Sequence, residues 1–134
     1  MHELFLPFPP TVNSYWAPVR NTPARRVSAK GRKFRAQVIQ EVSEQFPILG
    51  KTRIDYQVQL TVVLYPPDNR TRDLDNYMKA LLDALTHAGV WEDDSQADQL
   101  LIYRGAITKG GLAYVQIDYA GPVLPLPKAR GFPL

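Results

Sequence analysis

The sequence predicts a single-domain α/β protein, with helices packed on one mixed β-sheet and elements in the order β-α-β-α-β-β. Two periodicities lead to this prediction. Apolar residues alternate with polar ones in the segments expected to be strands, and they recur every three or four positions in those expected to be helices. At 134 residues the chain has the length of one domain.

The first half of the chain predicts a strand, a helix and a long second strand. Residues 3–8 indicate a short strand that ends at two prolines, and residues 9–27 indicate a loop. Ser28 is a favourable N-cap for a helix that continues to about residue 46. Strict alternation over residues 54–65 predicts a strand with one buried face, stopped by the next pair of prolines.

The second half predicts a helix followed by two strands. The helix should span about residues 74–88, with Gly89 as the residue that ends it. Alternation returns at residues 99–107 and 112–119. The T-K-G-G stretch at 108–111 predicts a tight turn, so the last two strands should pair with each other as a hairpin.

The composition excludes several kinds of functional site and indicates the cellular compartment. The chain has no cysteine, which excludes disulfides, thiolate zinc sites and cysteine nucleophiles. No apolar run is long enough to cross a membrane, and the N-terminus does not resemble a secretion signal. We therefore expect a cytoplasmic protein with no membrane partner. Residues 1–119 should form the domain, and residues 120–134 a Pro-rich extended or disordered tail.

Positive charge is concentrated in the N-terminal third. The formal net charge is only +3, but no acidic residue lies between Glu3 and Glu41, an interval that contains seven lysines and arginines. A segment whose charged side chains are all positive suits a polyanionic partner such as a nucleic acid. A solvated basic helix face would have the same composition.

Acidic residues cluster at two places in the second half. Asp73 and Asp75 flank the start of the predicted helix, and the triplet 92–94 (Glu-Asp-Asp) follows its end. Two carboxylates about 4 Å apart repel by roughly 4 kcal/mol at an effective dielectric near 20, so such a cluster needs a cation. Oxygen ligands without cysteine select Mg²⁺ or Mn²⁺ over zinc.

Each of these residues also has a structural interpretation. Asp75 could cap the helix, the 92–94 triplet could be a solvated turn, and Lys79 could simply pair with Asp75 one helical turn away. Together, the clusters favour a hard divalent metal acting on a phosphate.

The motifs resemble those of the RusA family of Holliday junction resolvases over about residues 4–119. The matching stretches are L-P-F-P-P-T-V-N-S-Y-W at 6–16, R-R-V-S-A-K-G-R-K-F-R at 25–35, R-D-L-D-N-Y-M-K-A-L-L-D-A-L at 72–85, A-G-V-W-E-D-D-S-Q at 88–96 and I-T-K-G-G at 107–111. The R-D-L-D-N…K and W-x-D-D motifs at this spacing are the most specific of them. The Pro-rich tail departs from the family pattern, as do some basic residues in the 17–27 segment.

The resemblance implies a Mg²⁺-dependent endonuclease that cuts four-way DNA junctions symmetrically as a homodimer, with Mn²⁺ as a substitute metal. The family's three essential aspartates fall on Asp73, Asp75 and Asp94, which would bind the metal, and its catalytic lysine falls on Lys79. We assign DNA-phosphate contacts to a set of basic side chains: Arg25, Arg26, Lys30, Lys33, Arg70, Arg72 and Lys109.

Two rival functions stay open at the level of the sequence. The first is a non-catalytic DNA-binding module whose acidic residues are structural. The second is a hydrolase that uses a carboxylate pair on sugars. The basic N-terminal third argues against the second, because a neutral sugar does not need a positive field.

Overall fold

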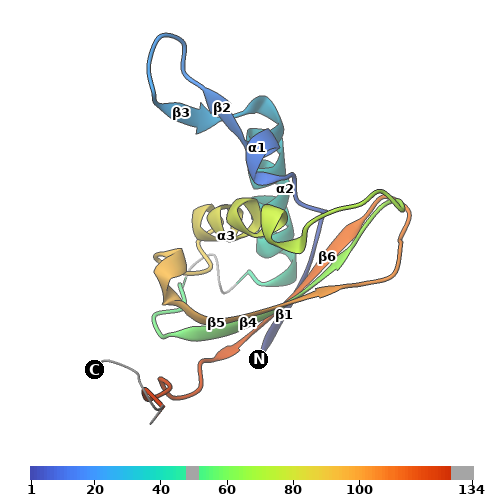
Figure 1. The fold of residues 1–134 in the computed structure, drawn as a ribbon. Helices are drawn as coiled ribbons and strands as arrows, with labels where there is room; N and C mark the ends of the chain where they lie inside the picture. The colour runs from blue at the N-terminus through green and yellow to red at the C-terminus, as the bar shows by residue number, and fades with distance from the viewer. Residues whose placement is uncertain (48–51, 128–134) are drawn as a thin grey trace.

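A four-stranded mixed sheet with two helices on one face forms the body of the protein (Figure 1). The computed structural model describes residues 1–47 and 52–127. The strand order is β1-β6-β4-β5, and the predicted α/β class is confirmed. The main elements are β1 (His2–Leu6), α2 (Ala29–Gln45), β4 (Val58–Tyr65), α3 (Met78–His87), β5 (Ala97–Arg104) and β6 (Leu112–Tyr119).

The pairing of the strands differs from the prediction at one important point. β6 is antiparallel to both β1 and β4, whereas β4 and β5 are parallel. The predicted hairpin between the last two strands is therefore wrong, because β4 lies between them. The 105–111 connection instead crosses the end of β4, where the Gly105 N–H donates to the Leu64 carbonyl at 2.8 Å.

The hydrophobic core lies between the sheet and the two long helices. Alternate residues of β4 are fully buried, and Phe34, Val38 and Val42 of α2 form the predicted buried stripe. Trp91 fills the core after α3, and its indole N–H donates to the Thr86 hydroxyl at 2.7 Å.

Helix boundaries follow the capping signals of the sequence. The Ser28 hydroxyl accepts from the Gly31 N–H at 3.0 Å and begins α2 as predicted. Gly89, with a φ of 80°, follows α3. The predicted 74–88 helix begins instead with one 3₁₀ turn, η1 (Leu74–Tyr77), and a second 3₁₀ turn, η2 (Asp94–Gln96), precedes β5.

The segment predicted as a loop at 9–27 contains regular structure. It forms a short helix, α1 (Val12–Tyr15), and a two-stranded hairpin of β2 (Trp16–Pro18) and β3 (Arg25–Val27). This hairpin projects from the body as an arm (Figure 1). Asn21 at its tip adopts a left-handed conformation with a φ of 62°, which asparagine tolerates better than most residues.

The predicted C-terminal tail is described only in part. Residues 120–127 contain neither helix nor strand, and the rest of the predicted tail, 128–134, lies outside the described residues.

Over the described ranges, no helix combines the length and apolar character needed to cross a membrane.

No helix or strand of the described residues covers the second face of the sheet (Figure 1). The cross-strand register places Phe5, Tyr114, Val63 and Tyr103 in one row across the four strands. Phe5 and Tyr103 are about half exposed. We call these four residues the aromatic row. It is an apolar strip on the side of the sheet opposite α2 and α3.

Gly31 allows α2 to pack closely against α1. A Cβ atom at this position would lie 2.6 Å from the Tyr15 carbonyl oxygen and 2.7 Å from a Val27 methyl. We expect Gly31→Ala to destabilise the protein by about 1–3 kcal/mol, because the backbone must shift to relieve the overlap. Urea unfolding measures this change. Since alanine favours a helix by about 1 kcal/mol over glycine, an unchanged or higher midpoint would show that α2 and α1 are not in close contact.

Candidate active site

The connection between β4 and β5 carries all four residues predicted to be catalytic. The two strands are parallel, so after β4 the chain must cross back to the edge of the sheet where β4 begins before it can enter β5. It does so through η1, α3 and η2. Asp73 and Asp75 lie at the beginning of this crossover, Lys79 in the first turn of α3, and Asp94 at the start of η2.

The Asp73 and Asp75 carboxylates are exposed and are not used as caps. Asp73 occupies the N-cap position of η1, but its side chain makes no capping hydrogen bond. The N-cap of α3 is Tyr77. The capping interpretation of the D-L-D motif therefore fails, and both carboxylates remain accessible to a ligand.

Lys79 connects the two ends of the crossover. Its Nζ lies 3.9 Å from Asp94 Oδ2, and no ion pair joins it to Asp75 among the described residues. The Lys79 side chain is 57% exposed and that of Asp94 31%, so the pair lies at the surface. An ammonium group from α3 and a carboxylate from η2 thus meet at the surface, where a ligand can reach both.

Asp93 has a structural role beside Asp94. Its carboxylate accepts from the Ser95 N–H at 3.0 Å, and hydrogen bonding to the side chain and then the backbone of Ser95 lowers the pKa of Asp93. The Gln96 side-chain oxygen accepts in return from the Asp93 N–H at 3.2 Å, which completes a capping box. The Gln96 amide also donates to the Ile54 and Tyr56 carbonyls. Asp93 therefore fixes the turn that presents Asp94.

A hydrogen-bonded triad joins the three helices beneath this site. The Tyr15 hydroxyl of α1 donates to the Asp83 carboxylate of α3, and Arg35 of α2 contacts the same carboxylate at 2.8 Å. Burial acts to raise the pKa of Asp83, but the bonds from Tyr15 and Arg35 outweigh it and hold that pKa below its usual value. Burial and the nearby Asp83 carboxylate raise the pKa of Tyr15. The triad fixes α2 relative to the crossover.

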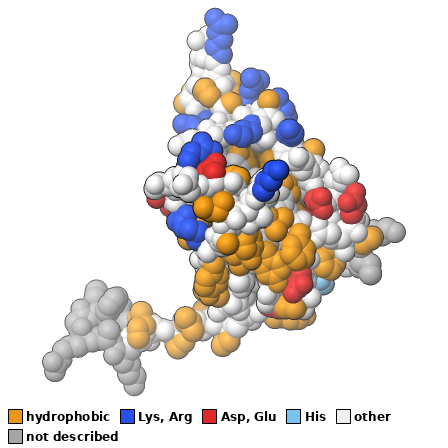
Figure 2. Space-filling model, turned by 90° about the vertical axis from the view of Figure 1, so that its right-hand side faces the viewer, with side chains coloured by type: hydrophobic (Ala, Val, Ile, Leu, Met, Phe, Trp, Pro, Cys, Tyr) orange, Lys and Arg blue, Asp and Glu red, His pale blue; other side chains and the backbone are white. Residues whose placement is uncertain are grey.

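The predicted DNA-contacting cations lie on three elements. Arg25 and Arg26 are exposed on the projecting arm, Lys30 and Lys33 are exposed on α2, and Lys109 is in the turn before β6. Figure 2 shows lysines and arginines gathered over the upper part of one side of the molecule, above a region rich in hydrophobic side chains.

Arg70 and Arg72 differ in availability. The Arg70 side chain is 77% exposed, whereas that of Arg72 is only 9% exposed. Arg72 lies 2.8 Å from the Asp68 carboxylate and donates to the Asp68 carbonyl at 3.1 Å, and its bonds with Asp68 strongly lower the pKa of that carboxyl. Arg72 thus organises the loop before Asp73, and Arg70 is the more accessible cation.

Comparison with known sequences identifies the family. A family model described as "Endodeoxyribonuclease RusA" matches residues 7–118. The chain belongs to the RusA family. One relative, the crossover junction endodeoxyribonuclease rusA of Enterobacteria phage HK97, is 38% identical over 117 residues, or 87% of this chain and 92% of the relative. Crossover junction endodeoxyribonuclease RusA of Escherichia coli (strain K12) is 34% identical over 90% of this chain and 96% of its own length.

The aspartates of this RusA family member suit a hard cation in their chemistry. Their donors are carboxylate oxygens, which Mg²⁺ prefers. Among the described residues, no three histidine, cysteine or acidic side chains are gathered as a metal site. Mg²⁺ usually takes one or two protein carboxylates and completes its shell with water and substrate phosphate, so an open arrangement of carboxylates fits this metal better than a closed cage.

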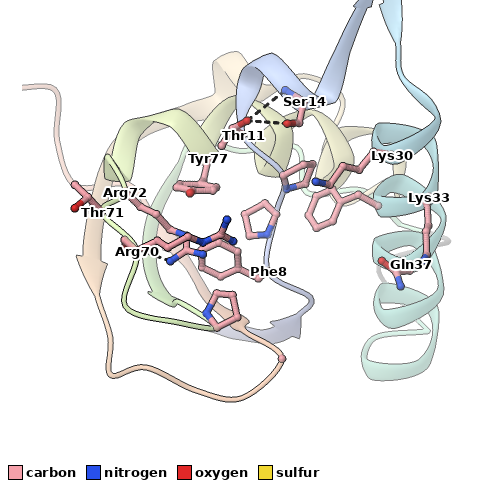
Figure 3. A pocket seen from close by; sticks show the side chains of 15 residues that line it. Phe8, Thr11, Ser14, Lys30, Lys33, Gln37, Arg70, Thr71, Arg72 and Tyr77 are labelled. Carbon is pink, nitrogen blue, oxygen red and sulfur yellow. Dashed lines mark hydrogen bonds between the residues drawn. The ribbon is translucent and has the colours of Figure 1, made fainter.

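Sequence reasoning missed two features of this RusA domain. The Tyr15–Arg35–Asp83 triad joins residues far apart in the chain, and the only local signal was a tyrosine in a polar loop. The second feature is a cavity of about 580 Å³ between α2 and the loop before η1, with Phe8, Tyr77 and Gln37 among its lining residues (Figure 3). Neither an aromatic at a strand end nor a helical glutamine suggests a cavity by itself.

Asp83 gives a pH-dependent prediction. At pH 7, Asp83→Asn should lower the free energy of unfolding by about 2 kcal/mol, because Arg35 loses its charged partner. The folded-state pKa of Asp83 is below its ordinary value of 3.8, so its stabilisation is present above that value and is lost as the pH falls through the folded-state pKa. The difference between the two proteins should therefore be present at about pH 5 and shrink below about pH 4.

Chemical denaturation across this pH range measures the difference. Asp98→Asn is the matched control, because Asp98 is exposed and bonds only the Gln57 side chain among the described residues. It should change stability by less than about 0.5 kcal/mol. An Asp83→Asn difference that persists at pH 3 would contradict the role of the charged carboxylate.

Proposed function

We propose that this protein is a metal-dependent endonuclease that resolves four-way DNA junctions by paired cleavage of phosphodiester bonds. The observation that carries the proposal is the meeting of Lys79 with Asp94 at an exposed edge of the crossover that also bears Asp73 and Asp75. The names of the relatives, crossover junction endodeoxyribonucleases, support the same substrate and reaction.

In this proposal Asp73, Asp75 and Asp94 bind Mg²⁺, for which Mn²⁺ can substitute. The bound ion would supply an activated water and neutralise charge on the cleaved phosphate. Lys79 stabilises the negative charge that develops on that phosphate, since its ammonium group is exposed beside Asp94. Asp93 holds the η2 turn and binds no metal.

The exposed cations position the DNA. Arg25 and Arg26 on the arm, Lys30 and Lys33 on α2, and Lys109 in the turn before β6 contact phosphates and do not read sequence. Arg70 joins them, and Arg72 contributes mainly by holding the loop that carries it. With a DNA substrate and no cysteine, the protein would act in the cytoplasm.

A non-catalytic DNA-binding module is the alternative. It predicts junction binding that EDTA does not affect and no nicking with Mg²⁺ or Mn²⁺. The carboxylates of Asp73 and Asp75 are exposed and do not cap a helix, which favours the enzyme. A purely structural acidic residue would be hydrogen-bonded within the fold, as Asp93 is.

The three aspartates provide the main test. Asp73→Asn, Asp75→Asn and Asp94→Asn should each abolish cleavage of a synthetic junction while junction binding stays the same or strengthens, since each change removes a negative charge near DNA phosphates. Gel-based cleavage and mobility-shift assays measure the two effects. Asp98→Asn is the control and should cleave normally. Near wild-type cleavage by any of the three variants at saturating Mg²⁺ would remove that residue from the ligand set.

Lys79 should matter more for rate than for binding. Lys79→Ala should lower the cleavage rate about 10²-fold or more, as expected for loss of one electrostatic stabiliser, with junction affinity reduced by less than about tenfold. Single-turnover cleavage at saturating protein separates the rate from affinity. Lys109→Ala should show the opposite pattern, a weaker affinity with a normal rate. Equal losses of affinity and rate in Lys79→Ala would identify Lys79 as an ordinary phosphate contact.

The working unit in this proposal is a symmetric homodimer. Resolution needs two nicks on opposed strands, and a two-fold pair of chains supplies two sites that match the symmetry of the junction. The aromatic row supports one placement of the contact. It is apolar, it lies on the uncovered face of the sheet, and it leaves the basic side of the molecule free for DNA.

The dimer can be tested in solution. Sedimentation of the wild-type protein at micromolar concentration should show a dimer, and Phe5→Glu combined with Tyr103→Glu should convert it to a monomer that makes uncoupled single nicks. Ile39→Glu is the control, because Ile39 is an exposed apolar residue of α2 away from the row. A wild-type monomer that makes single nicks would exclude the dimer, and a dimer unaffected by the double substitution would exclude this interface.

A further inference from the structure

The cavity between α2 and the loop before η1 is separate from the aspartates. Its walls come from α2 on one side and from the Phe8–Thr11 and Pro67–Arg72 segments on the other. At about 580 Å³ it has the size of a small-ligand site. None of Asp73, Asp75 and Asp94 lines it, although Arg72 directly precedes Asp73 and Tyr77 lies between Asp75 and Lys79 in the chain.

The charge of the cavity suits a phosphate. Lys30 and Lys33, one turn apart on α2, face Arg70 and Arg72 across it (Figure 3), and none of its lining residues is acidic. Within the described ranges, neither Lys30 nor Lys33 makes an ion pair. Arg72 and Arg70 both pair with Asp68, and Arg70, which is 77% exposed, shares Asp68 with Arg72 at the rim of the cavity. Among the described residues, Lys30 and Lys33 are therefore the unpaired cations of the cavity.

The interior of the cavity suits a flat apolar group. Phe8 and Tyr77 pack edge to face with ring centroids 5.0 Å apart, which fixes both rings, and Pro9 and Pro10 adjoin them. Phe34 adds a third aromatic side chain from α2. A groove that contacted only phosphates would not need this surface, whereas a nucleobase stacks on aromatic side chains with a gain of about 1–3 kcal/mol.

Gln37 supplies a polar group beside this surface. It follows Lys33 by one helical turn and is exposed, and its side chain has no hydrogen-bond partner among the described residues. Gln40, one turn further, instead donates to Glu44 at 3.0 Å and does not line the cavity. A carboxamide can donate and accept at the same time, which is the pattern that recognises the edge of a base.

We propose that this cavity binds one unstacked nucleotide of the junction, close to the cleaved phosphate. The base lies against Phe8, the ring that buried Tyr77 holds edge to face, with its edge at Gln37. Its phosphate lies among Lys30, Lys33 and Arg70. This proposal rests on the proposed function. It makes efficient cleavage depend on a base that can leave the stack, and bases at the centre of a junction do so at least cost.

Removal of the base is the first test. Junctions carrying one abasic nucleotide, moved stepwise through the positions around the cut, retain every phosphate. At one position kcat/KM should fall about tenfold or more relative to the intact junction, because the aromatic surface loses its ligand. Cleavage equal to that of the intact junction at every position would mean that the cavity binds backbone phosphate only, and would overturn the proposal.

Fluorescence of 2-aminopurine is the second test and does not depend on activity. With wild-type protein bound to the junction in EDTA, 2-aminopurine at that same position should change in emission, since the base moves from the DNA stack onto the cavity wall. Gln37→Ala should alter the relative cleavage rates for the four bases at this position by about tenfold, and Gln40→Ala should leave them unchanged. No change of emission at any position, or unaltered preferences in Gln37→Ala, would overturn the proposal.

The two hypotheses fail in different ways. If intact junctions are not cleaved at all, the proposed function is wrong. If they are cleaved but the abasic and fluorescence results are negative, only the nucleotide site is wrong.

Discussion

The parallel pairing of β4 with β5 is the constraint on which the candidate site depends. Parallel neighbours cannot be joined by a tight turn, so the chain must cross one face of the sheet between them. Burial of Leu81 and Leu85 against the sheet fixes the orientation of α3 in this crossover and leaves Lys79 exposed beside Asp94. One connection thus carries all four candidate catalytic residues and brings two of them, Lys79 and Asp94, into contact.

The Tyr15–Arg35–Asp83 triad connects this crossover to the helix that carries two of the predicted DNA-contacting lysines. It joins α3, which carries Lys79, to α2, which carries Lys30 and Lys33, through a part-buried carboxylate. The cations predicted to contact DNA and the groups proposed to act on the phosphate are therefore held in one geometry. The opposite face of the sheet carries the aromatic row, which the proposed dimer would cover, and on the same face the Tyr114 hydroxyl contacts Glu3 while Gln116 donates to Asp118.

Local features of the fold could be predicted because their signals are local. Ser28 as a cap, Gly89 as a helix end and the buried stripe of α2 all follow from neighbouring residues. Partner choice among strands is not local. The turn at 108–111 exists, yet β4 separates the two strands that flank it, because β4 pairs along both of its edges. The arm was missed because three-residue strands are too short to show alternation. Among the site residues, the roles of the aspartates and Lys79 stay predictions from the sequence motifs, and the contact of Lys79 with Asp94 in place of Asp75 depends on the path of the crossover.

Cleavage of an immobile four-way junction, compared with that of a linear duplex of the same arm sequence, distinguishes a metal-dependent junction endonuclease from a protein that only binds DNA. Both are incubated with the purified protein, with and without Mg²⁺. We expect paired, symmetric nicks in the junction only when Mg²⁺ is present, and no cleavage of the duplex. Equal cleavage of both substrates, or binding to the junction without nicking at any Mg²⁺ concentration, would contradict it.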